Sequence, residues 1–200
     1  MQQHEIDRRT KDLVDAVRRI FEAEIDAGHP NASQLEGALG LMAELRPDPN
    51  RPEATELSVC RHLPRALDSG EAGPAAEIAK ALRDIAPSLA WAQNPRYNAD
   101  NKGADFMENY GWSGLGLTGS SAMSFGVLLL GPGITYPPTS YPSEGVFLVI
   151  AGSPEWKSGD GPWVSVQDGS IVCRPLNGAE GKRAGADPML ALYAWMYPQN

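Results

Sequence analysis

The sequence contains few of the residues that bind metals or form disulfides. Its 200 residues include only three histidines, at positions 4, 29 and 62, so the last two thirds of the chain contain none. The two cysteines, Cys60 and Cys173, lie far apart, and there is no CxxC pair. This pattern excludes a zinc ribbon and a disulfide framework, and it predicts a reducing, cytoplasmic location. A histidine-based metal site in the C-terminal region is excluded as well.

Long apolar runs and excess positive charge are also missing. The apolar runs fall far short of the roughly 20 residues that a membrane-spanning helix needs. The opening stretch MQQHEIDRRTKDLVD is charged and has no apolar segment, which predicts no signal peptide. The net charge is −8 and the pI is about 4.9. Because nucleic acids and anionic membranes attract basic surfaces, we expect neither as a partner.

The first part of the chain has a helical pattern. Apolar residues such as Leu13, Val17 and Phe21 recur at spacings of three and four, and Gly28 supplies a stop. Three more helices are expected, the second of them interrupted at Pro64: from Ser33, from Thr55 and from about Pro74 to Ile85.

After Pro87 the pattern changes to short apolar blocks separated by glycines, which is typical of an all-β barrel or sandwich. Strands are expected at 111–117, 124–130, 145–151, 153–157, 162–166, 170–174 and 189–196. We interpret GPGITYPPTSYPSEGVF, residues 131–147, as a Gly/Pro turn between strands. We expect the polar segment 94–111 to be a loop over the barrel mouth. The predicted class is α+β, with a helical region at 1–87 and a double-stranded β-helix (jelly roll) at 88–200.

Several separated segments resemble one known family in order and spacing. They are LLLGPGITYPPTSYPSEGVFLVIAGSPEWKSGDGPW, DGSIVCRP, DPMLALYAWM and, in the helical region, CRHLPRAL. They are similar to the bacterial dimethylsulfoniopropionate (DMSP) lyases, whose C-terminal barrel is a cupin. The resemblance covers nearly the whole chain. It implies a β-elimination in which a tyrosine removes the proton α to the carboxylate, and dimethyl sulfide and acrylate form.

The resemblance also implies a divalent metal, Zn, Fe or Mn, that stabilises the enolate-like charge. The family's metal motif has the form YPxHxHxxxExY, with a later histidine, and here it begins at Tyr136 and Pro137. Every ligand position is substituted here: the motif falls on Thr139, Tyr141, Gly145, Phe147 and, for the later histidine, Glu180 or Ala179. We therefore expect no metal cofactor.

Tyr136 is the candidate catalytic base. A phenol with a pKa of about 10 needs a nearby cation to act near neutral pH. Without a metal, that cation would be Arg174, Lys182 or Arg183, if one of them points inward. The alternative is that Tyr136 is a packing residue whose hydroxyl bonds the backbone.

The candidate substrate-binding residues are Tyr141, Trp112, Trp163 and Arg174. The aromatic rings could attract a sulfonium or quaternary ammonium group by cation–π interaction, and a basic side chain could hold a carboxylate. Alternatively, the rings fill the core. Glu180 could be a ligand or base, or a solvated charge in the loop NGAEGKR. Cys173 is interpreted as a structural thiol.

Three functions stay open. The first is a catalytically degenerate DMSP-lyase-like cupin that binds at most a small zwitterion or carboxylate. The second is an active lyase with Tyr136 as base. The third is a packed barrel with a structural role. A homo-oligomer is left open in each case.

Overall fold

The structure is a computed structural model that describes residues 2–199. Four main helices form the N-terminal part: α1 (Gln3–Asp26), α2 (Ala32–Met42), α3 (Leu63–Glu71) and α4 (Ala76–Ile85). The third predicted helix is split, because a 3₁₀ turn at Ser58–His62 precedes α3 and Pro64 lies in its first turn, where proline is tolerated. Within residues 2–199, no helix is long and apolar enough to cross a membrane.

The strands form two antiparallel sheets that face each other. The six-stranded sheet has the order β10 (Ile171–Arg174), β7 (Glu144–Ala151), β12 (Met189–Met196), β5 (Met123–Leu130), β3 (Tyr110–Gly114), β2 (Ala90–Ala92). The four-stranded sheet has the order β6 (Thr135–Ser140), β11 (Ala179–Arg183), β8 (Glu155–Ser158), β9 (Trp163–Ser165). A short pair, β1 (Arg46–Pro47) and β4 (Leu117–Thr118), lies apart from both. The fold is the predicted helical region followed by a cupin barrel.

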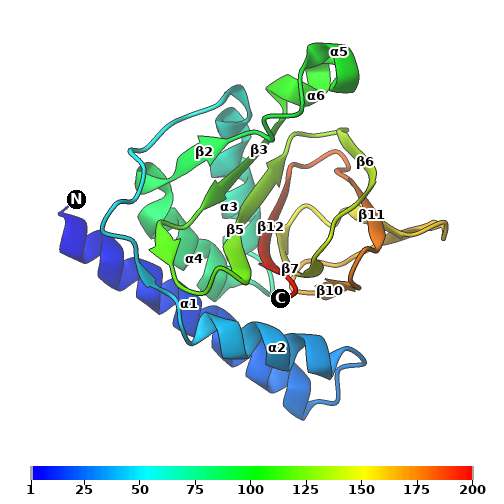
Figure 1. Cartoon of the computed structure of the whole chain (residues 1–200). Coiled ribbons are helices and arrows are strands. Elements are labelled where there is room, and N and C mark those ends of the chain that lie inside the picture. The colour runs from blue at the N-terminus through cyan, green and yellow to red at the C-terminus, as the bar shows by residue number, and fades with distance from the viewer. Residues whose placement is uncertain (1, 200) are drawn as a thin grey trace.

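The six-stranded sheet is buried on both faces. Along β12, Leu190 and Leu192 belong to the core shared with the helices, whereas Ala191 and Tyr193 belong to the core between the sheets. Figure 1 shows the helices α1 to α4 on the outer side of this sheet and β6 and β11 on its other side. Alternation along each strand therefore decides which side chains reach the barrel interior. The predicted boundary at residue 87 stays a prediction.

Two segments that were expected to be turn or loop are strands. Within 131–147 lies β6, and within NGAEGKR lies β11, which pairs with β6. Proline is compatible with β6 because this strand is at a sheet edge, where one row of N–H groups has no ladder partner. The polar segment 94–111 contains two short helices, α5 (Ala99–Lys102) and α6 (Ala104–Glu108), instead of an irregular loop.

The contact of α3 with the sheet can be tested at a glycine. A methyl group at Gly70 would lie 2.8 Å from Cγ2 of Ile150 and 2.9 Å from Cβ of Ala79. We expect Gly70→Ala to lower the free energy of unfolding by about 1–3 kcal/mol, because overpacking outweighs the gain in helix propensity. Gly40→Ala in α2 has open space and should raise it by roughly 0.5–1 kcal/mol. Urea denaturation measures both, and a stabilising Gly70→Ala would contradict the packing.

Candidate functional site

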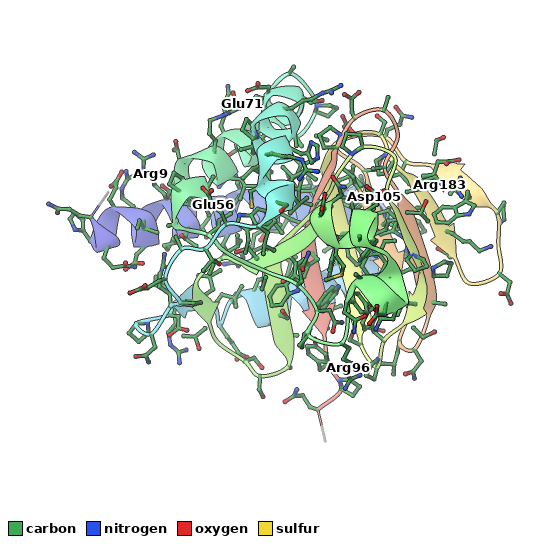
Figure 2. The ribbon with its side chains drawn as sticks, turned by 90° about the horizontal axis from the view of Figure 1, so that it is seen from above. Arg9, Glu56, Glu71, Arg96, Asp105 and Arg183 are labelled. Carbon is green, nitrogen blue, oxygen red and sulfur yellow. The ribbon has the colours of Figure 1, made fainter. Side chains whose placement is uncertain are left out.

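Three tyrosine hydroxyls meet at one end of the barrel interior. Tyr136, on β6, is 5 % exposed, and its hydroxyl lies 2.7 Å from that of Tyr97 and also bonds that of Tyr141. The Tyr97 and Tyr141 hydroxyls are 3.1 Å apart. Tyr97 belongs to the segment 94–111, so this segment covers that end of the barrel, as its position in Figure 1 and, from above, in Figure 2 also shows. We call these residues the tyrosine trio.

Next to the trio lies a buried ion cluster. Glu180 and Lys182 are two residues apart on β11, so both side chains lie on the same face of the strand and point inward. Arg174 reaches them from the end of β10. Oε1 of Glu180 is 2.9 Å from Nζ of Lys182 and 3.2 Å from Nε of Arg174. The three side chains are only 2–3 % exposed. The reading of Glu180 as a solvated loop charge is therefore wrong, because the loop is a strand and this side chain is on its inner face.

The amine of Lys182 is enclosed by aromatic rings. Its Nζ lies 4.6 Å from the ring centre of Phe147, 4.8 Å from that of Trp156 and 5.2 Å from that of Tyr136. Burial lowers the pKa of Lys182, while the Glu180 carboxylate acts in the opposite direction. We call these three rings the aromatic box. Ring faces attract cations, so the aromatic box and the Glu180 carboxylate together favour an ammonium at this position.

Arg174 also points inward, but most of its donors are engaged. Nη1 donates to the main-chain oxygens of Ser143 at 2.7 Å and Tyr141 at 3.3 Å, and Nη2 donates to Oγ of Ser143 at 3.0 Å. A Cβ on Gly145 would lie 3.2 Å from Nη2 of Arg174 and 2.9 Å from the Phe147 ring. The guanidinium therefore occupies space that a side chain at Gly145 would need.

The phenols of the trio are difficult to ionise in this setting. Burial raises the pKa of Tyr136, and the neighbouring phenols of Tyr110 and Tyr141 raise it further. Burial also raises the pKa of Tyr141. The interior thus favours protonated tyrosines, which act as hydrogen-bond donors more readily than as bases.

The side chains at the family's ligand positions do not fit a divalent metal. Oγ1 of Thr139 donates to the Pro137 carbonyl at 2.9 Å, Phe147 packs on Trp156, and Glu180 is held by two cations. No group of three or more His, Cys, Asp or Glu side chains within residues 2–199 is arranged to hold a metal ion. Because divalent metals need several converging N, O or S donors, the residues present disagree with the metal that the family implies.

Among residues 2–199, the other candidates form no hydrogen bond or ring pair with the trio. Trp112 is half-buried and packs against the core between the sheets. Trp163 carries the Arg183 guanidinium at 4.3 Å from its ring centre, and Arg183 pairs with Glu155 on the outside of the barrel, where Figure 2 labels it. The half-buried thiol of Cys173 packs toward the helices, and burial raises its pKa to about 11.

Sequence reasoning named Lys182 only as one of three possible inward cations, and it did not include Trp156 or Tyr97 among the candidate site residues. The available signal was the two-residue spacing of Glu180 and Lys182, which places both on one face of a strand.

The ion cluster predicts an asymmetry between two arginines. Arg174→Met leaves the buried Glu180 with one cation fewer and frees the 141–143 turn, so we expect a loss of about 3–5 kcal/mol in the free energy of unfolding. Arg183→Met removes a partly exposed pair and should cost less than about 1 kcal/mol. Urea denaturation of both variants measures the difference. Equal, small losses would mean that Arg174 is not buried with Glu180.

Comparisons with known proteins agree with this fold. The family model for DMSP lyase matches residues 33–191. The DMSP lyase DddQ of Ruegeria pomeroyi is 26 % identical over 179 residues, which cover 86 % of each chain. A chain from the crystal structures of the DMSP lyases RdDddP and RnDddQII superposes with a TM-score of 0.75 at 23 % identity, covering 94 % of this chain and 92 % of that one. For crystalline DddQ of R. pomeroyi the TM-score is 0.62 at 22 % identity, with 91 % and 92 % covered. The chain belongs to the DMSP lyase family.

Proposed function

We propose that this protein is a DMSP-lyase-like cupin that binds a small carboxylate or zwitterion and has lost the metal-assisted elimination. The observation that carries the proposal is the buried cluster of Lys182, Glu180 and Arg174 inside the barrel. This cluster supplies fixed positive charge from side chains, in a barrel whose remaining donors do not suit a metal.

Elimination requires a base and a cation that stabilises the developing negative charge more strongly than it binds the substrate. Here the candidate base has a raised pKa, because Tyr136 is buried among other phenols. The two cations already contact Glu180, and Arg174 also contacts the main chain of the 141–143 turn. These features support binding without efficient turnover.

One observation favours the alternative of an active lyase with Tyr136 as base. The Tyr136 hydroxyl contacts those of Tyr97 and Tyr141, and these would stabilise a phenolate at Tyr136 only if both donate to it, because in the present arrangement their hydrogen bonds raise the pKa of Tyr136. Lys182 would then be the cation near the substrate. In the third alternative, the packed barrel, the interior side chains form a structural core and bind no ligand.

A dimethyl sulfide assay separates these functions. Purified protein is incubated with DMSP after chelator treatment and again after addition of Zn²⁺, Fe²⁺ or Mn²⁺, with R. pomeroyi DddQ assayed in parallel. We expect release no greater than the protein-free blank under every condition, because residues 2–199 contain no ligand set that would recruit the added metal. Metal content is measured on the same samples.

A thermal-shift series with DMSP, acrylate and glycine betaine completes the test. We expect at least one of them to raise the unfolding midpoint. Release of dimethyl sulfide that Tyr136→Phe abolishes would establish the active lyase instead. If no compound shifts the unfolding midpoint, the packed barrel is the function that remains.

A further inference from the structure

The ion cluster carries more positive than negative charge. Arg174 and Lys182 contribute two cations, and Glu180 is their only ion-pair partner among residues 2–199. A buried charge without a counter-charge is costly, so a net positive cluster favours an anion beside it. Because Glu180 is itself adjacent, a second negative charge on that anion would be repelled.

Hydrogen-bond donors are also in excess here. An ammonium has three N–H donors, and in the described part of the chain Lys182 is held by one oxygen, Oε1 of Glu180. Nε1 of Trp156, whose ring lies against Nζ of Lys182, is buried without an acceptor among residues 2–199. Oε2 of Glu180 is buried without a donor in the same part of the chain. The free hydrogen-bond donors of Lys182 and Trp156 therefore outnumber this one free acceptor. A carboxylate, which only accepts, matches this set.

The rings around the ion cluster and in the tyrosine trio already carry cations from the protein. Lys182 lies over the rings of Phe147, Trp156 and Tyr136. The two remaining rings of the trio carry Arg174, at 5.4 Å from the centre of Tyr141, and Lys102, at 4.3 Å from the centre of Tyr97. A sulfonium or quaternary ammonium ligand would have to displace these residues and would be repelled by them.

We infer that Lys182 anchors a site for a small monocarboxylate with an uncharged tail, and that this site discriminates against organic cations and onium zwitterions. The inference rests on the proposed binding function and narrows its ligand class. Lys182 binds the carboxylate, Glu180 and the aromatic box hold the ammonium in place, and the tyrosine trio lies at the covered end of the barrel beside it. The Tyr141 ring, which was a candidate to bind a cationic ligand, thus faces the Arg174 side chain of the protein itself.

The test uses sodium propionate as probe, with glycine betaine, tetramethylammonium chloride and sodium chloride at matched ionic strength. Binding is followed by thermal shift and by isothermal titration calorimetry on the full chain. We expect saturable binding of propionate alone to the unsubstituted protein. Lys182→Met should weaken propionate binding by at least about tenfold, since a charge-assisted hydrogen bond is lost. Lys157→Met, on the adjacent strand β8 with its side chain outside the interior cores, is the matched control and should bind normally.

Circular dichroism checks that Lys182→Met folds. If it does not, Trp156→Phe keeps an aromatic ring but removes the indole N–H together with the five-membered ring, and it should weaken propionate binding several-fold. Equal propionate affinity in every folded variant tested would overturn the inference, as would binding of tetramethylammonium or betaine as tight as that of propionate. Tight binding of betaine would leave the proposed function standing and overturn only the inference. If no compound shifts the unfolding midpoint, both the proposed function and the inference are defeated. Release of dimethyl sulfide from DMSP, which is itself an onium zwitterion, would defeat both.

Discussion

A single carboxylate inside the barrel, that of Glu180, holds two cations in place. Its Oε1 contacts Lys182 and Arg174, and each cation organises a different neighbourhood. Arg174 ties down the 141–143 turn, which positions Tyr141 beside Tyr136. Lys182 fills the space between the rings of the two sheets. Because breaking one contact of a buried ion pair leaves a charge without its partner, the geometry of this end of the barrel depends on all three side chains together.

The cluster changes the chemistry that this barrel can support. The cations are organic, they are fixed by hydrogen bonds and ring faces, and their positions are linked to small residues such as Gly145, where a side chain would collide with Arg174. The phenols beside them are kept protonated by burial. Together these features favour an anion-binding interior over one that abstracts protons, in a chain that belongs to the DMSP lyase family.

The sequence predicted the helices, the central strands and the family, because amphipathic periodicity, apolar blocks and separated motif segments are local signals. It did not predict β6 or β11. Prolines in β6 and glycines with alternating charges in β11 resemble turns, and only pairing between the two segments makes them strands. The two-residue spacing places Glu180 and Lys182 on one face of a strand, but only the pairing of β11 with its neighbours decides that this face is the inner one. The family motif nevertheless pointed to Tyr141, Phe147 and Glu180, which the structure gathers around Arg174 and Lys182.

The most direct measurement of the central claim is side-chain NMR of Lys182, assigned by the loss of its signals in Lys182→Arg. An amine enclosed by three aromatic rings predicts ε-methylene protons shifted strongly upfield by ring currents, with nuclear Overhauser contacts to Phe147 and Trp156. Lysine signals all at solvent-exposed positions, with no contact to an aromatic ring, would contradict the account.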